Sequence, residues 1–306
     1  MFVNLHSSGT DAIITILKSK NIKAVIVAQD MCPEVIFKLI QSDFNVILAP
    51  VYSISSVAAY GETYLKETLE NPLLNVCILF SHPYGIYSEN KLILLMDMLR
   101  DADLIISDCC LCNPIAIIEK FSLPETIPVV FSFGYSKVID LGGGGLSLTD
   151  NKIKTDMPSI TKNISRHGHE YKLKASFSNQ NIDHFLKNDI YKALAELSAN
   201  LNNKKSNYRE RLKGIFFNDR YIDSEWRFIL LTDMRLKEAE KIRNKMKQHN
   251  VFLGLNYPLQ KIFYSKVELD LYTMNKNGWP INIFTDFRVS EDYMKGVPVL
   301  KELLTK

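Results

Sequence analysis

The stretch that decides the fold runs from Phe131 to Asp150 and reads FSFGYSKVIDLGGGGLSLTD. Residues 129–133 and 145–149 have the composition of two buried strands, and a loop that carries Lys137 and four consecutive glycines joins them. The glycine run lets the backbone turn tightly and pass close to another part of the molecule. It is not a dinucleotide-binding fingerprint, because a strand and not a helix follows it. The stretch therefore predicts a lysine on a loop between two strands of a sheet.

Upstream of this stretch, apolar strands alternate with helical patterns, which is typical of an α/β layer with a mainly parallel sheet. The pattern predicts helices over 10–20, 34–41 and 89–100, and strands over 24–28, 46–49, 75–81 and 103–106. Asp108 follows the last of these strands, at the edge where parallel sheets bind their ligands. A carboxylate among apolar neighbours is costly unless it meets a positive group, although helix capping explains Asp108 equally well.

Downstream of Asp150 the composition changes to a polar, basic stretch that ends near residue 180. The periodicity of residues 183–213 then predicts one long helix. The remainder predicts strands over 226–231 and 251–255, a short segment over 281–284, and helices over 236–248 and from 291. We therefore expect a large α/β domain over 1–182, a connecting helix over 183–213 and a small α+β domain over 214–306.

The composition excludes several classes of protein. Of the 306 residues, 46% are apolar and 23% are charged, which is typical of an ordinary globular protein. The net charge of +3 is too small to indicate nucleic acid or an anionic membrane as a partner. No apolar run reaches the roughly 18 residues of a membrane span, and the first ten residues lack the features of a secretory signal. We expect a cytoplasmic protein that acts on a small molecule.

The five cysteines form an odd set: Cys32, Cys77, Cys109, Cys110 and Cys112. Cys109 and Cys112 have Cys-x-x-Cys spacing, but no second pair of cysteines or histidines completes a zinc site. We therefore expect reduced, buried thiols and no bound metal.

The segment Ser7–Ala12 (SSGTDA) places small residues directly before the first predicted helix. Free N–H groups and the helix dipole at such a position favour an anion such as a phosphate. Thr10 is a candidate N-cap, and a capped helix start without any ligand is the simpler explanation when this segment is taken alone. The segment gains meaning only together with Asp108 and Lys137.

In this order and context, the segments resemble the DegT/DnrJ/StrS family of sugar aminotransferases, which belong to fold type I of the pyridoxal-phosphate enzymes. The lysine stretch and its glycine loop carry the most specific likeness. Weaker likenesses are SSGTDAI at the start, HPYG at His82–Gly85, Arg166–Gly168, Asn179 and Asn256–Pro258. The resemblance implies a mainly parallel sheet in a large domain, a small α+β C-terminal domain, and pyridoxal 5′-phosphate as the cofactor.

The resemblance also implies roles for six residues. Lys137 would form a Schiff base with the cofactor, and Asp108 would pair with the ring nitrogen. The cofactor's phosphate would be bound by Gly9, Thr10, Ser132 and, from the neighbouring subunit, Asn179. The site would therefore need a homodimer.

The implied activity is the transfer of an amino group, usually from glutamate, to a nucleotide-linked keto sugar in nucleotide-sugar and polysaccharide biosynthesis. A lysine at position 137 argues against the related sugar dehydratases, which have histidine there. Two departures motivate an alternative, a degenerate member that binds the cofactor or a partner without efficient transamination. Leu111 stands where the family has a glutamine that meets the cofactor's 3-hydroxyl, and the Ser-Gly-Thr motif begins at residue 8, where the family has a substantial preceding segment.

Overall fold

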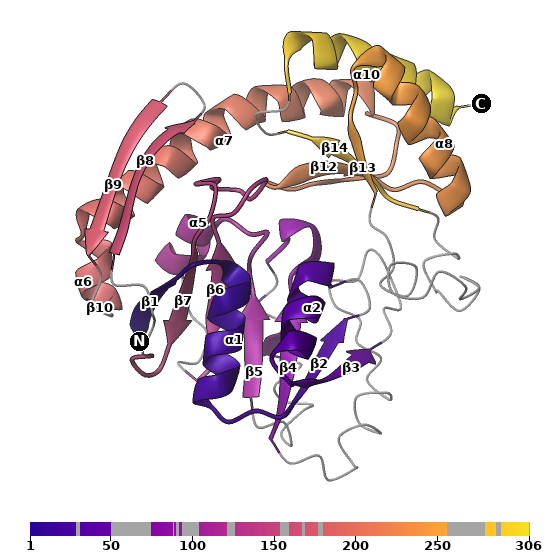
Figure 1. Ribbon diagram of the computed structural model, residues 1–306. Helices are drawn as coiled ribbons and strands as arrows, with labels where there is room; N and C mark the ends of the chain where they lie inside the picture. The colour runs from indigo at the N-terminus through magenta and orange to yellow at the C-terminus, as the bar shows by residue number, and fades with distance from the viewer. Residues whose placement is uncertain are drawn as a thin grey trace.

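The computed structural model describes residues 1–28, 31–49, 75–87, 89, 92–93, 104–120, 126–153, 159–166, 169–176, 180–255, 279–285 and 289–305. Within them, the larger of the two main sheets has the strand order β10-β1-β7-β6-β5-β4-β2-β3 (Figure 1). Neighbouring strands are parallel from β3 to β6 and antiparallel from β6 to β10. The predicted α/β fold with a mainly parallel sheet is confirmed.

The strands of this sheet are β1 (Phe2–His6), β2 (Ala24–Ala28), β3 (Asn45–Ala49), β4 (Val76–Ser81), β5 (Leu104–Asp108), β6 (Val129–Ser132), β7 (Gly145–Thr149) and β10 (Gln180–Asn181). Their central members are apolar at successive positions because both faces of the sheet are covered. In β4, Ile78 and Phe80 belong to one hydrophobic core, and Cys77 and Leu79 belong to the core on the opposite face.

Helices cover both faces of the sheet. On one face lie α1 (Gly9–Ser19) and α2 (Pro33–Gln41), which contribute apolar residues to the same core as Cys77. On the other lie α5 (Pro114–Glu119), α6 (Ile182–Leu186) and the first part of α7 (Asp189–Ile215). The result is a three-layer α/β/α arrangement. Sheets of this kind bind their ligands at the edge formed by the carboxyl ends of the parallel strands.

A second sheet has the strand order β11-β12-β14-β13, with antiparallel neighbours throughout. Its strands are β11 (Tyr221–Asp223), β12 (Arg227–Leu230), β13 (Leu253–Leu255) and β14 (Ile281–Phe284). It is accompanied by α8 (Leu236–Met246), the short helix η2 (Lys247–His249) and α10 (Glu291–Leu304), and these elements enclose a separate hydrophobic core. In Figure 1, α7 runs from the large sheet to this smaller one.

Two parts of the structure differ from the sequence-based expectations. The predicted helix 183–213 is two helices, because Asn188 interrupts the first and caps α7 by accepting a hydrogen bond from the N–H of Ile190 at 2.9 Å. The polar stretch before residue 180 contains a hairpin, β8 (Ser159–Arg166) and β9 (His169–Ser176), which lies beside α7 (Figure 1). Most of the helix predicted over 89–100 lies outside the described residues, and the predicted domain boundaries stay predictions.

Strand β1 was also missed, since the segment is short and two of its five residues, Asn4 and His6, are polar. Its polar residues Asn4 and His6 are nevertheless buried, because they bond to β7. The Asn4 amide donates to Thr149 Oγ1 at 2.8 Å, and His6 Nε2 lies 2.9 Å from Ser147 Oγ. A buried polar layer therefore joins these two strands, which a pattern of hydrophobic residues does not reveal.

All five cysteines are free. Cys77, Cys109 and Cys112 are buried as expected. Contrary to the prediction, Cys32 is exposed, because it lies directly before α2, and Cys110 is only partly buried, because it lies in the turn after β5. In the described part of the chain, no group of three or more histidine, cysteine or acidic side chains could hold a metal ion. Across the same residues, no helix is both long and apolar enough to cross a membrane.

Candidate functional site

The start of α1 follows directly from the carboxyl end of β1. Ser8 is the N-cap, and its hydroxyl accepts a hydrogen bond from the N–H of Asp11 at 3.0 Å. The expectation that Thr10 caps the helix is wrong, because the helix already begins at Gly9 and Thr10 belongs to its first turn. Gly9 and Thr10 consequently lie at the positive end of the helix dipole, where an anion is stabilised.

Gly9 brings this helix start against the ends of β5 and β6. A Cβ atom at Gly9 would lie 2.6 Å from Cys110 Sγ and 2.9 Å from Ser132 Cβ, so a larger residue would push the helix away. The glycine loop approaches from the other side, where a Cβ at Gly145 would lie 2.4 Å from the carbonyl carbon of Ser8. The start of α1, the turn after β5 and the end of β6 therefore meet at one place.

Asp108 ends β5 and is 8% exposed. Its Oδ1 accepts a hydrogen bond from the N–H of Cys110 at 3.0 Å. Burial, followed by the charge of Asp108, raises the pKa of the Cys110 thiol well above its usual range, and the charge of Lys137 acts in the opposite direction. Because both charges act on the same thiol, Asp108 and Lys137 lie in one electrostatic neighbourhood with Cys110.

Lys137 lies on the loop between β6 and β7 and is partly buried. The loop has hydrogen bonds of its own: the N–H of Lys137 donates to the carbonyl of Gly134 at 3.2 Å. The buried carboxylate of Asp140 accepts from the N–H of Ser136 at 3.1 Å and from that of Gly142 at 2.8 Å. Ser136 has a φ of 64°, a left-handed conformation that the surrounding bonds must maintain. Lys137 is thus presented by an ordered turn.

The motif His82–Gly85 forms a tight turn after β4, beside the turn that follows Asp108. His82 Nε2 lies 2.9 Å from Ser107 Oγ, one residue before Asp108. Gly85 has a φ of 73°, and a Cβ there would lie 2.3 Å from the carbonyl oxygen of Leu111. The Leu111 side chain is partly buried and packs against the hydrophobic core of the smaller sheet. This side chain is apolar and offers no hydrogen-bonding group.

Five of the six predicted site residues thus lie around one edge of the large sheet: Gly9, Thr10, Asp108, Ser132 and Lys137. Asn179 lies outside the described residues, as do His167, Gly168 and Asn256–Pro258. Sequence reasoning missed Cys110 and Asp140. Their positions, two residues after Asp108 and three after Lys137, are the signal that could have indicated them.

No family model matches the sequence, and no curated protein sequence matches it either. Among solved structures, a sugar aminotransferase from Streptococcus pneumoniae, Spr1654 in its PMP form, is 13% identical with a TM-score of 0.67 over 99% of this chain and 87% of that chain. The Helicobacter pylori aminotransferase PseC, which is involved in the biosynthesis of pseudoaminic acid, is 14% identical with a TM-score of 0.64 over 99% and 86%. A DegT DnrJ EryC1 StrS aminotransferase from Brucella abortus is 12% identical with a TM-score of 0.66 over 99% and 86%. At such identities the likeness establishes a shared fold.

Proposed function

We propose that this chain is a pyridoxal-phosphate-dependent aminotransferase that transfers an amino group from an amino acid, glutamate, to a nucleotide-linked keto sugar in the cytoplasm. The observation that supports this most is the meeting of the start of α1 with Asp108, Ser132 and Lys137 at the carboxyl edge of the sheet. The solved structures that share the fold are aminotransferases, which also supports this proposal.

The residues present fit the cofactor in their chemistry. Pyridoxal phosphate carries a dianionic phosphate, a ring nitrogen that binds a proton, and an aldehyde that reacts with amines. At this edge of the sheet, a helix N-terminus and the Ser132 hydroxyl match the phosphate. The Asp108 carboxylate matches the ring nitrogen, and the Lys137 amine matches the aldehyde. These are three different chemical demands, and each has a matching group.

When bound, the cofactor supplies an electrophilic carbon for amines and a ring that withdraws electrons from the adjacent substrate carbon. The first turn of α1, with Gly9 and Thr10, and the hydroxyl of Ser132 bind and orient the phosphate. The Asp108 carboxylate would hold a proton at the ring nitrogen, because a negative charge beside that nitrogen favours its protonated form. The Lys137 amine would hold the cofactor through its aldehyde carbon, and its Nζ would move a proton to and from the reacting carbon of the substrate.

The proposal includes a homodimer in which Asn179 of the partner subunit completes the phosphate site. In this chain Asn179 directly precedes β10, which forms the outer edge of the large sheet by pairing with β1. An edge strand is a natural place for a second copy to approach, and two-fold pairs are the commonest oligomers.

Titration of the purified protein with pyridoxal phosphate, followed in the visible spectrum, tests the proposal. We expect a cofactor band in the wild type that bleaches when glutamate is added. Asp108→Asn should keep the band but bleach roughly 100-fold more slowly, because the amide fits the same space without holding the proton. Asp189→Asn is the matched control, since the Asp189 side chain is 99% exposed on α7.

The outcomes separate the two candidate functions. A cofactor band that forms but that no amino donor bleaches would favour the degenerate member that binds the cofactor without transamination. The apolar Leu111 is the residue that motivates this alternative. A protein that forms no band at all would contradict the aminotransferase and would leave, of the alternative, only a degenerate member that binds a partner.

A further inference from the structure

The two carbonyl groups on either side of Lys137 are both bound by donors from the C-terminal part of the chain. Trp226 Nε1 donates to the carbonyl of Ser136 at 2.9 Å. Lys205 Nζ donates to the carbonyl of Val138 at 3.2 Å. Trp226 lies in the turn before β12, and Lys205 lies on α7. The residue before Lys137 and the residue after it are therefore both held from outside the loop.

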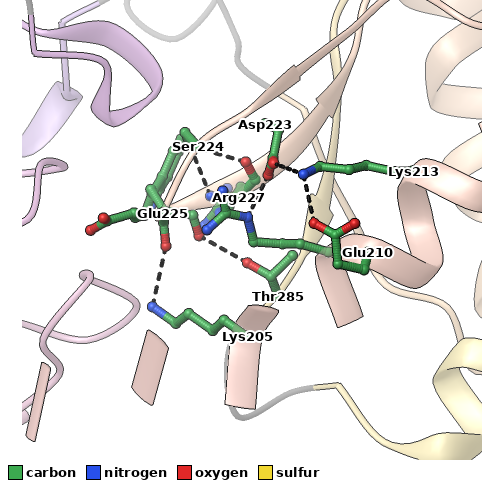
Figure 2. A network of polar contacts seen from close by, with 10 residues as sticks. Lys205, Glu210, Lys213, Asp223, Ser224, Glu225, Arg227 and Thr285 are labelled. Carbon is green, nitrogen blue, oxygen red and sulfur yellow. Dashed lines mark hydrogen bonds and ion pairs between the residues drawn. The ribbon is translucent and has the colours of Figure 1, made fainter. Parts of the chain in front are cut away.

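Lys205 is only 4% exposed, an unusual environment for an ammonium group. A buried charge of this kind needs strong acceptors, and Lys205 also donates to the carbonyl of Glu225 at 3.4 Å (Figure 2). Glu225 directly precedes Trp226. One ammonium group consequently joins α7, the turn that carries Trp226, and the loop that carries Lys137.

The turn that carries Trp226 is itself fixed. Ser224 Oγ accepts from the N–H of Arg227 at 3.1 Å, and the Thr285 hydroxyl donates to the carbonyl of Trp226 at 3.3 Å (Figure 2). The Arg227 guanidinium carbon lies 4.0 Å from the centre of the Trp226 ring, which adds a cation–π contact. The indole N–H therefore points at the Ser136 carbonyl from a rigid support.

We propose that Lys205 and Trp226 are positioning residues for Lys137, an inference that rests on the proposed function of Lys137. The Asp140 bonds shape the loop from within, and the Lys205–Trp226 pair fixes it relative to α7 and the smaller sheet. Ser136 has the left-handed conformation directly before Lys137, and its carbonyl is the one that Trp226 binds. Loss of either donor lets the peptide groups around Lys137 relax, so that the loop no longer holds the amine in a single geometry.

Hydrogen exchange of the cofactor-free protein is the first test, with Trp226→Phe and Lys205→Met as the variants. Trp226→Phe keeps an aromatic ring and removes only the donor. We expect amides of residues 134–142 to exchange about tenfold faster in each variant, since each loses one hydrogen bond that holds the loop. Lys205→Arg, which keeps a charged donor, should restore most of the protection. Lys192→Met, at a 67% exposed position of α7, should leave the loop unchanged.

The second measurement is the rate at which pyridoxal phosphate labels Lys137, fixed with borohydride and read by peptide mapping. We expect both variants to label about tenfold more slowly than the wild type. Unchanged exchange in the loop, or equal acceleration in the loop and in strand β2, would overturn the proposal, because the two residues would then have no role or a general structural one. If the wild type takes up no cofactor, the exchange result still decides the positioning role, and the failure belongs to the proposed function.

Discussion

Acid should destabilise this protein through His6, the last residue of β1. The ring is 1% exposed, and its Nε2 lies 2.9 Å from Ser147 Oγ. In the described residues, no hydrogen-bond partner lies within reach of Nδ1, so a second ring proton would have no acceptor there. Burial lowers the pKa of His6 from 6.5 to about 4, although the nearby Asp11 opposes this shift.

The size of the effect follows from linkage between protonation and folding. The difference between the ordinary pKa of 6.5 and the folded-state pKa of about 4 corresponds to about 3 kcal/mol of unfolding free energy. The unfolded chain binds the proton more readily than the folded one, so acid favours unfolding. The contribution of the neutral ring is complete above pH 6.5, and it is lost progressively as the pH falls to about 4.

Urea unfolding of the wild type and of His6→Gln at pH values from 7 to 4 measures this contribution. The glutamine can bond to Ser147 without taking up a proton, so its free energy of unfolding should fall less with acid than that of the wild type. The difference between the two curves should change by about 3 kcal/mol across the range. His184→Gln, at an exposed position, controls for loss of a histidine. Parallel curves for the wild type and His6→Gln would refute the reasoning.

Further changes have equally definite expectations. Gly9→Ala should cost about 1–3 kcal/mol in urea unfolding and weaken cofactor binding, since the added Cβ would lie 2.6 Å from Cys110 Sγ. Gly214→Ala, in α7 with nothing within 4 Å of its Cβ, should instead stabilise by about 0.5–1 kcal/mol, and a loss of stability there would contradict the helical environment. Asp140→Ala should slow labelling of Lys137 by the cofactor, because two N–H groups of the loop lose their acceptor. Sedimentation should show a dimer whose dissociation on dilution is reduced by pyridoxal phosphate, and a strict monomer that binds the cofactor tightly would remove Asn179 from the site.

The elements that the sequence predicted well are those whose apolar residues face a core on both sides, such as β2 and β4. Asp108 was identifiable because it follows an apolar strand, whereas Ser132 was assigned only through the family resemblance. Strand β1 was missed because Asn4 and His6 are buried by bonding to a strand about 140 residues away along the chain. Lys205 and Trp226 carry no local signal, since their partners in the lysine loop are 67 and 90 residues distant in sequence. Such contacts depend on how the two sheets pack, which periodicity does not encode.

The central claim is that Lys137 is the amine that binds the cofactor. Incubation with pyridoxal phosphate, reduction with borohydride and peptide mapping test it most directly, because reduction fixes the cofactor on the lysine that holds it. We expect the label on Lys137, and we expect Lys137→Ala to remain folded but unlabelled. A label on any other lysine, or a Lys137→Ala variant that is labelled like the wild type, would contradict the account.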